Sequence, residues 1–323
     1  MNAPILVINT GGTFGMVKGS QGLEPSGDLH LSLKKYIEHL DRYAFDLINL
    51  DPLIDSSDLR PSDWTRIAET MINAKDQYSG FMVIHGTDTL AYTSSALSFL
   101  LNGLTTPIVV TGSQYPIGSV EGDAEINFCH AMDYLLSRSA SGVEVCFGQK
   151  RLQGNRVRKI DAQDFVAFDQ PNGPVLSQIA AQAAPESLSI DDQSVATLFI
   201  YPGMPASIID TLTQNDRLRA IILLSFGSGN VPTRSSDLGE GLRRATDKGV
   251  LLINLTQCHR GHVVQGAYAT GSLLAELGAL EGFDMTPEAA FAKAHYLLAL
   301  YGTKKAVVTE WSQPLCGEFT LRG

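Results

Sequence analysis

The chain of 323 residues contains little cysteine, and the cysteines that it has are dispersed. They form neither a Cys-x-x-Cys pair nor a dense cluster, and they stand at Cys129, Cys146, Cys258 and Cys316. A small secreted scaffold held together by disulfides would need cysteines at a much higher density. We therefore interpret these four residues as free thiols of a protein in a reducing cytosol.

Positive charge and long apolar segments are also scarce. Lys and Arg number 24 against 34 Asp and Glu, so the formal net charge is −10. Nucleic acids and anionic membrane surfaces bind basic faces, and we expect neither as a partner. No apolar run approaches the roughly 20 residues of a membrane span, and no basic segment and apolar segment of a signal peptide precede the first expected strand. These absences predict a cytoplasmic protein.

The sequence does contain two short loops in which threonine stands beside glycine. The first, Thr10–Thr13 (TGGT), closes the apolar run 5–8, and the second, His85–Thr89 (HGTDT), closes the apolar run 80–84. Apolar runs of this kind are typical of parallel strands that are buried on both faces. Because open α/β sheets bind ligands at the carboxyl ends of their strands, both loops are candidates for a ligand site.

A threonine hydroxyl is a poor nucleophile unless a base or a lowered pKa activates it. The second loop supplies Asp88, but a lone aspartate is a weak base at neutral pH. Lys159 is a candidate for the missing group, because a lysine beside carboxylates can relay protons.

Each of these residues also has a purely structural interpretation. Thr10 and Thr13 can be capping hydroxyls after a glycine turn, and Thr87 and Asp88 can be a helix N-cap. Lys159 can belong to a solvated charge cluster, since Arg156, Arg158 and Asp161 are its sequence neighbours. His85, between an apolar strand and a glycine, is interpreted as structural. His259 and His262 complete no metal-binding pattern, so we expect no metal.

The two loops resemble motifs of the cytosolic, type I branch of the L-asparaginases. Further stretches that match this family are Asp55–Asp58, Val110–Gln114, Gly154–Arg156 with Lys159, and Asn254–Cys258. The resemblance extends along almost the whole chain. Either loop alone is a weak signal, whereas both loops in order, together with the lysine, are a strong one.

The resemblance implies hydrolysis of the side-chain amide of L-asparagine through a covalent acyl-enzyme, without a cofactor. It makes Thr13 the nucleophile and makes Thr87, Asp88 and Lys159 a second triad that transfers protons. Backbone amides near the two threonines would stabilise the oxyanion. The residues expected to contact the substrate are Asp55, Ser56, Ser57, Gly86, Thr87, Asp88 and Asn230.

The resemblance also implies an oligomer. Asn230, in the turn Gly227–Asn230, would reach the substrate from a neighbouring subunit, so that a homodimer or a homotetramer is the working unit. One departure concerns residues 14–30, which we expect to be a loop. They resemble the mobile lid that covers the site in this family. Many family members carry a tyrosine there, whereas this chain has Leu23. Tyr268 is either its replacement as a catalytic residue or a packing residue.

Three functions follow from these residues. The first is an L-asparaginase. The second is an amidohydrolase that acts on glutamine or releases ammonia for a tRNA-linked amidotransferase, although the acidic charge argues against the latter. The third is an asparagine sensor that has lost turnover through Leu23.

The order of expected elements predicts an α/β fold with two domains. Strands are expected at 5–8, 45–50, 80–84, 107–110 and 143–147, with helices at 31–40, 62–72, 91–101 and 124–136. Alternation at this spacing favours a parallel sheet. We expect a larger, flavodoxin-like N-terminal domain over 1–184, a linker over 185–194, and a smaller C-terminal α/β domain over 195–323.

Overall fold

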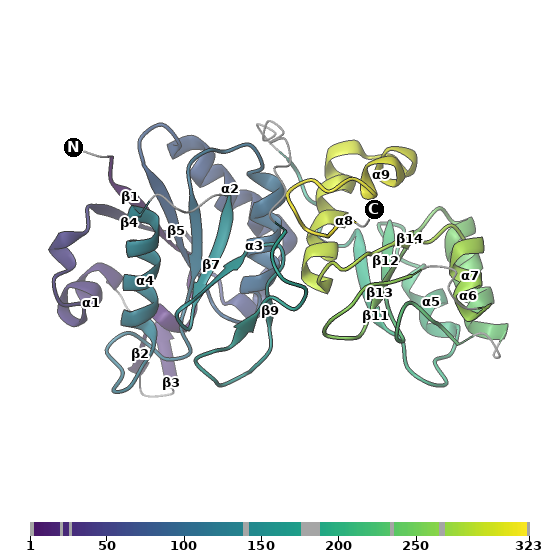
Figure 1. Ribbon diagram of the computed structural model, residues 1–323, viewed down its shortest axis with the longest axis horizontal. Helices are drawn as coiled ribbons and strands as arrows, with labels where there is room; N and C mark the ends of the chain where they lie inside the picture. The colour runs from purple at the N-terminus through teal and green to yellow at the C-terminus, as the bar shows by residue number, and fades with distance from the viewer. Residues whose placement is uncertain are drawn as a thin grey trace. The chain divides into compact units, whose positions relative to one another are not determined.

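The computed structural model describes residues 3–19, 22–25, 28–137, 142–175, 188–232, 236–264 and 269–321. These residues form two compact units (Figure 1). Unit 1 contains the described residues up to 170, and unit 2 contains residues 171–175 and those from 188 onward. The predicted boundaries, 1–184 and 195–323 joined by 185–194, stay a prediction.

The elements of unit 1 alternate between strands and helices. Its strands are β1 Ile5–Asn9, β2 Met16–Gly19, β3 Gly22–Pro25, β4 Phe45–Asn49, β5 Gly80–Ile84, β6 Ile108–Thr111, β7 Val143–Phe147, β8 Lys150–Gln153, β9 Arg158–Lys159 and β10 Phe168–Asp169. Its helices are α1 Leu29–Tyr36, α2 Pro61–Ala74, α3 Leu90–Leu100 and α4 Ala124–Leu136, with the 3₁₀ turns η1 Thr13–Gly15, η2 Leu40–Arg42 and η3 Ser56–Asp58.

The main sheet of unit 1 has the strand order β4-β1-β5-β6-β7-β8. The first five strands pair in parallel, and β8 pairs antiparallel with β7. In chain order the parallel strands lie second, first, third, fourth, fifth, which is the flavodoxin-like arrangement. This confirms the predicted fold class. The chain leaves β1 toward one edge and returns beside it in β5, so the loops after β1 and β5 diverge at the switch point where such sheets bind ligands.

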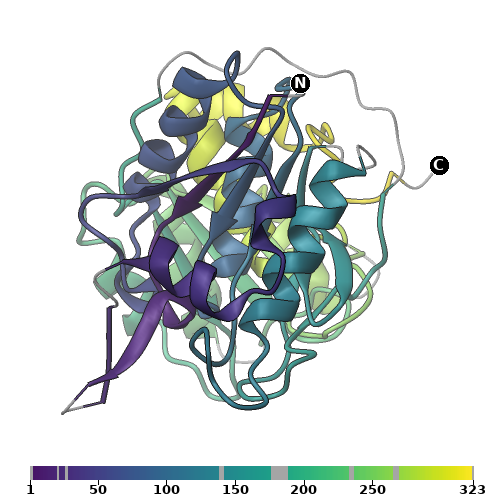
Figure 2. The ribbon, with the colours of Figure 1, turned by 90° about the vertical axis from the view of Figure 1, so that its left-hand side faces the viewer.

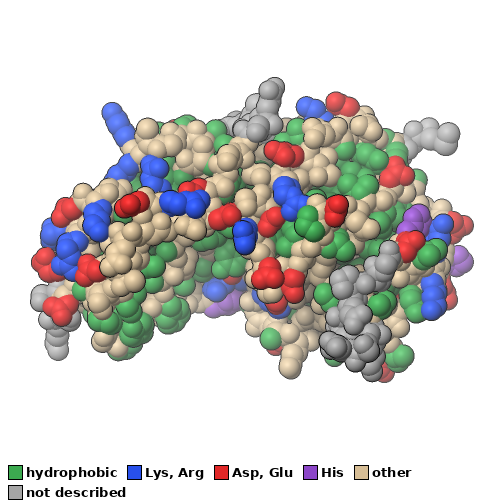
Figure 3. Space-filling model, turned by 180° about the vertical axis from the view of Figure 1, so that it is seen from behind, with side chains coloured by type: hydrophobic (Ala, Val, Ile, Leu, Met, Phe, Trp, Pro, Cys, Tyr) green, Lys and Arg blue, Asp and Glu red, His purple; other side chains and the backbone are tan. Residues whose placement is uncertain are grey.

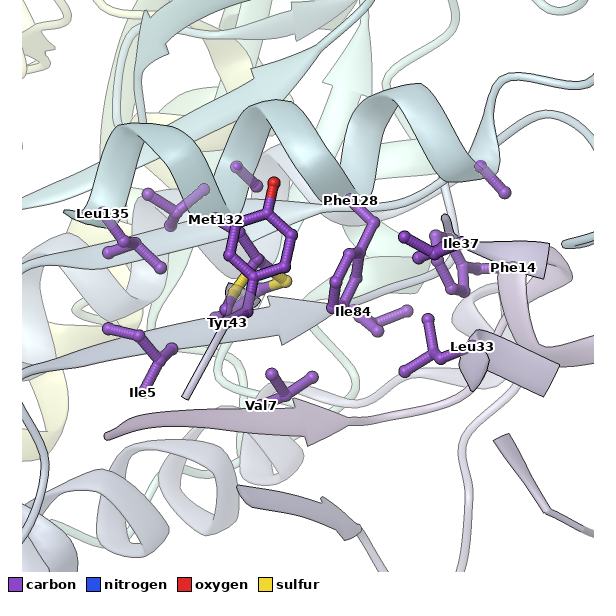
Figure 4. Packing of buried hydrophobic residues seen from close by; sticks show 14 of the residues in the cluster. Ile5, Val7, Phe14, Leu33, Ile37, Tyr43, Ile84, Phe128, Met132 and Leu135 are labelled. Carbon is purple, nitrogen blue, oxygen red and sulfur yellow. The ribbon is translucent and has the colours of Figure 1, made fainter. Parts of the chain in front are cut away.

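Helices cover both faces of this sheet (Figures 1 and 2). Ile5 and Val7 of β1 face the core cluster under α1 and α4, where Phe128 and Met132 contribute the helix side (Figure 4). Leu6, between the first two, is buried as well. Burial on both faces explains why the strand sequence is continuously apolar rather than alternating.

Unit 2 is a second α/β layer with its own core. Its sheet has the order β11-β12-β13-β14, and all three pairs are parallel. The strands are β11 Val195–Phe199, β12 Ala220–Ser225, β13 Leu251–Thr256 and β14 Leu280–Glu281, and the helices are α5 Ser207–Leu212, α6 Ser236–Asp247, α7 Ala269–Glu276, α8 Pro287–Tyr301 and α9 Lys304–Trp311. The predicted smaller α/β domain is confirmed.

Three local predictions need correction. The region 14–30, expected to be a loop, contains η1 and the antiparallel ribbon of β2 and β3, which Figure 2 shows extending from the unit. The helix expected over 31–40 ends earlier, at Tyr36, because Ile37 is extended. The helix expected over 62–72, α2, begins one residue earlier, at Pro61, whose missing N–H suits the first helical position, and Asp63 accepts from the backbone N–H of Arg60.

Charges of both signs are mixed on the face drawn in Figure 3. Among the described residues, no helix has the length and apolar character to cross a bilayer. Over the same residues, no three His, Cys, Asp or Glu side chains gather as metal ligands would. The four cysteines are free thiols.

Candidate active site

The turn after β1 is fixed by its own side chains. Asn9 accepts a hydrogen bond from the backbone N–H of Gly11 at 3.1 Å and donates to Asn49 on β4 at 2.8 Å. Thr10 donates its hydroxyl to the carbonyl of Ile84 at 2.9 Å, which fastens the turn to β5. Thr10 therefore has a structural partner. Asn9 was not among the residues predicted from the sequence. It could have been recognised as a polar residue at the end of an apolar strand.

Glycine is required where this turn meets the loop after β5. Gly12 has φ of 88°, and a Cβ there would lie 2.4 Å from the Cα of Gly86. A Cβ on Gly86 would in turn lie 2.4 Å from the hydroxyl oxygen of Ser56. Because only hydrogen atoms fit between these chains, the segments around residues 12, 56 and 86 lie in direct contact.

Lys159 reaches the loop after β5 from the short strand β9. Its Nζ donates to Thr87 Oγ1 at 2.9 Å and lies 2.9 Å from Asp88 Oδ1. The lysine side chain is 21% exposed and that of Asp88 is 62% exposed, so the group is open to solvent on one side. The structure thus joins three of the predicted residues into one cluster and does not place Lys159 in a free surface charge cluster.

Neither Thr87 nor Asp88 is the N-cap of α3. The N-cap residue is Thr89, whose hydroxyl donates to the carbonyl of Ser56 at 2.7 Å instead of capping the helix. The hydroxyl of Thr87 is therefore not used as a helix cap, and it accepts a hydrogen bond from Lys159.

Asp55 and Ser57 form a local turn beside this cluster. The Oδ1 atom of Asp55 accepts from both the backbone N–H and the hydroxyl of Ser57, each at 2.9 Å. Ser56, between them, is buried against Gly86. Asp55 and Ser57 are exposed, so their polar groups are accessible to a ligand.

Thr13 begins η1 and is partly buried. The next residue, Phe14, is fully buried and packs on Phe128 of α4 with 6.3 Å between the ring centroids. Its carbonyl accepts from the N–H of Ile117 at 3.1 Å. Thr13 is thus held between the Gly12–Gly86 contact and an anchored aromatic side chain.

A cavity of about 350 Å³ opens beside this turn. Its walls come from β1, the glycine turn, η1, the first residue of β2 and the segment before η3. They consist of Asn9, Gly11, Gly12, Gly15, Met16, Leu53, Ile54 and Asp55. A cavity of this volume, with a carboxylate and backbone groups at its wall, has room for a small polar ligand.

His85 supports the loop from inside the unit. Burial lowers its pKa to about 4, so the ring is neutral at physiological pH. Its Nδ1 lies 2.8 Å from the carbonyl oxygen of Gly86, and its Nε2 lies 2.9 Å from the hydroxyl of Thr93. Since a carbonyl only accepts, Nδ1 carries the hydrogen and Nε2 accepts from Thr93. This agrees with a structural role.

The structure does not bring the remaining predicted residues to this cluster. Asn230 belongs to unit 2, where its backbone pairs with that of Phe226 in the turn after β12. The backbone of Leu23 pairs with Lys18 in the β2–β3 ribbon, and its side chain is not among those described. Tyr268 lies outside the described residues. Their roles stay predictions.

Comparison with known proteins gives matches along the chain. Residues 4–189 match the family model "Asparaginase, N-terminal", and residues 194–310 match "Glutaminase/Asparaginase C-terminal domain". L-asparaginase 1 of Escherichia coli K12 is 39% identical, with 98% of each chain covered. The mouse 60 kDa lysophospholipase is 36% identical over 98% of this chain and 62% of its own length. The crystal structure of L-asparaginase I from Vibrio cholerae has a TM-score of 0.86 and 36% identity, and covers 99% of this chain and 100% of that one.

Proposed function

The chain belongs to the asparaginase family and is an amidohydrolase, and on that premise we propose that it hydrolyses L-asparagine to L-aspartate and ammonia through a threonine acyl-enzyme. The contact of the Lys159 amine with both Thr87 and Asp88 carries this proposal. A lysine placed against a hydroxyl and a carboxylate can pass a proton between them and a bound ligand.

In the proposed reaction, Thr13 Oγ1 attacks the side-chain carbonyl carbon of asparagine. The new C–O bond gives a tetrahedral oxyanion, which collapses as the C–N bond breaks. The nitrogen takes up the proton that the Thr13 hydroxyl has lost and leaves as ammonia. Water then hydrolyses the ester, which releases aspartate and restores the hydroxyl of Thr13. Thr87, Asp88 and Lys159 transfer the protons and orient the attacking oxygen.

Backbone and side chains around the nucleophile supply the other requirements. Backbone amides near Thr13 and Thr87 stabilise the oxyanion, a contribution of about 3 kcal/mol per donor in other hydrolases. The exposed carboxylate of Asp88 binds the α-ammonium group of the substrate. The polar groups of Asp55, Ser56 and Ser57, together with Gly86, bind its α-carboxylate.

Glutamine is the alternative substrate. The family model that matches the C-terminal part of the chain covers glutaminases as well as asparaginases. The two amides differ by one methylene, which a pocket distinguishes by only about 1–3 kcal/mol. Relative kcat/KM values for the two substrates decide between them.

The experiment for the proposed function is ammonia release from asparagine by the purified chain and by Thr13→Ala. We expect turnover by the parent chain and loss of turnover in the variant, with asparagine binding retained. Binding without turnover in the parent chain would support the sensor hypothesis that Leu23 raises.

Tyr268→Phe tests whether Tyr268 replaces the lid tyrosine. If Tyr268 is catalytic, the variant should show a sharp fall in kcat with the fold intact.

We place the protein in the cytoplasm, as a homodimer or homotetramer in which Asn230 completes the site of a neighbouring subunit. The free cysteines agree with a reducing compartment. Subunit mixing tests the shared site: if Thr13→Ala and Asn230→Ala are each inactive, a hybrid that combines them regains intact sites. Hybrids that stay inactive would assign both residues to one subunit.

A further inference from the structure

The first turn of α4 carries a buried carboxylate that does not cap its own helix. Asp123 stands at the N-cap position, where aspartate normally accepts from the helix N–H groups, yet it makes no such bond. The side chain turns to the loop after β6 and accepts from the backbone N–H of Gln114 and of Tyr115, at 2.9 to 3.0 Å. Asp123 is only 5% exposed. The carboxylate thus bonds to the beginning of the loop that it ends, residues 112–123, instead of capping α4.

Asn127 lies one turn further along α4 and acts on two loops at once. Its Nδ2 donates to the carbonyl of Gly112 at 3.0 Å and to the Asp123 carboxylate at 3.1 Å. Its Oδ1 accepts from the N–H of Gly148, after β7, at 3.1 Å. Asn127 is 1% exposed, and these bonds use both sides of its amide. The two side chains therefore fix the loops that follow β6 and β7.

Both loops touch the loop between β9 and β10, residues 160–167. Gln114 donates its side-chain amide to the carbonyl of Asp164 at 3.0 Å, and the ring of Tyr115 packs edge-on against Phe165 with 5.7 Å between centroids. Gly148 lies against the backbone of the same residue, since a Cβ on it would come within 2.4 Å of the Phe165 carbonyl oxygen. The loop after β6 and the loop after β7 thus each contact residues 164–165 independently.

The supported segment is joined directly to Lys159. Lys159 pairs antiparallel with Phe168, and Ile160 donates its backbone N–H to Ala167 at 2.8 Å. The Phe168 ring packs on Phe147 of β7 at 4.9 Å. A two-residue strand pair has little stability of its own, so its position depends on what holds its loop.

We propose that Asp123 and Asn127 are positioning residues that set the place of the Lys159 amine against Thr87 and Asp88. Neither residue touches the lysine. They hold the loops after β6 and β7, these loops hold residues 164–166, and that segment fixes β9. The inference rests on the proposed function, in which Lys159 transfers protons, but the position of the amine can be measured without any turnover.

Asp123→Asn is the sharpest test. The amide keeps the shape and one acceptor oxygen, but its NH₂ group would face a backbone N–H, and two donors cannot bond to each other. We expect kcat for asparagine to fall at least tenfold with KM within threefold, because the substrate-binding groups stay in place. In a crystal structure of the variant, the distance from Lys159 Nζ to Thr87 Oγ1 should exceed 3.5 Å.

Tyr134→Phe is the matched control. Tyr134 lies at the other end of α4 and bonds to Glu144, so its loss removes a polar contact of the same helix away from the two loops. We expect a loss in Tm comparable to that of Asp123→Asn and an unchanged kcat.

Asn127→Asp is the second variant. A carboxylate at position 127 cannot donate to the carbonyl of Gly112 and repels the carboxylate of Asp123. We expect the same fall in kcat as for Asp123→Asn.

The outcomes separate the two proposals. A parent chain that does not release ammonia from asparagine overturns the proposed function, while the crystallographic distances still decide the positioning role. Equal kcat losses in Asp123→Asn and Tyr134→Phe, or an unmoved Lys159 amine, would make Asp123 merely structural. If neither Asp123→Asn nor Asn127→Asp folds, these residues serve the fold as a whole and the positioning role is wrong.

Discussion

At the scale of single residues, the central contact joins positions 72 apart in the sequence. Lys159 donates to Thr87 and pairs with Asp88 in the loop that follows β5. The pair is too exposed to contribute much stability, since ion pairs open to solvent are worth about 0–1 kcal/mol. We therefore expect the pair to serve catalysis, so that its removal should lower kcat more than the free energy of unfolding.

Lys159→Met tests this expectation. Removing a group that transfers protons lowers rates by about 10²–10⁴-fold, so we expect a fall in kcat of that order with little change in Tm. The measurement is steady-state ammonia release alongside thermal unfolding. Lys75→Met, which changes an exposed lysine after α2, is the control and should keep the parental kcat.

Gly12→Ala is the second prediction at this scale. Gly12 and Gly249 share a φ of 88°, but a Cβ on Gly249 meets no atom within 4 Å. Gly249→Ala should therefore cost only the backbone strain, about 1–2 kcal/mol, and keep activity. Gly12→Ala adds a collision with Gly86 and should abolish turnover as the turn moves away. Equal activity of the two variants would contradict a close contact at Gly12.

At the scale of elements, one buried ion pair ties α8 to the end of the chain. Lys293 on α8 donates to the carbonyls of Trp311 and Gln313 at 2.7 Å and to Glu318 at 2.6 Å, and neither charged side chain is exposed. Burial lowers the pKa of Lys293, and the Glu318 carboxylate opposes that shift. Because Glu318 also accepts from the N–H of Leu315, the pair orders the chain after α9.

Lys293→Met should destabilise unit 2 by about 3–5 kcal/mol, since it leaves a carboxylate buried without its cation. Urea unfolding, followed by far-UV circular dichroism, measures this change. The double variant Lys293→Met with Glu318→Gln removes the unpaired charge and should recover part of the loss. No recovery in the double variant would mean that the hydrogen bonds, rather than the charge, carry the effect.

At the scale of the whole molecule, each unit contains a histidine that burial keeps neutral. Burial lowers the pKa of His85, in unit 1, and of His295, on α8 in unit 2, from 6.5 to about 4. The unfolded chain takes up protons at these positions below pH 6.5, whereas the folded chain does so only near pH 4. Stability is therefore complete above pH 6.5 and falls as the pH drops through this window.

We expect Tm to fall between pH 6.5 and pH 4, with a loss of about 3 kcal/mol for each histidine by the end of the window. Calorimetry over a pH series measures it. His295→Gln carries no titratable group and should show a shallower decline, while His39→Asn, at an exposed histidine, should follow the parent. A parental decline in His295→Gln would assign the acid sensitivity to carboxylates.

Much of the architecture could be predicted because it depends on neighbours in the chain. The short apolar runs 5–8 and 80–84 are typical of strands covered on both faces, and the glycines after them mark turns at the strand ends. Short elements without a clear hydrophobic pattern were not predicted. Examples are the two-residue strands β9 and β10, whose pairing depends on contacts with Phe147 and Gly148, outside both strands.

The sequence by itself determined which loops carry threonine, aspartate and glycine, and that a parallel sheet brings the ends of their strands to one edge. Only the tertiary structure decided that the Lys159 amine lies 2.9 Å from Thr87 and that Asp123 bonds to the beginning of the loop before α4 instead of capping that helix. The physical reason is that propensity and periodicity act over a few residues. A distance between side chains from separate loops is the sum of many packing contacts, and no short stretch of sequence encodes it.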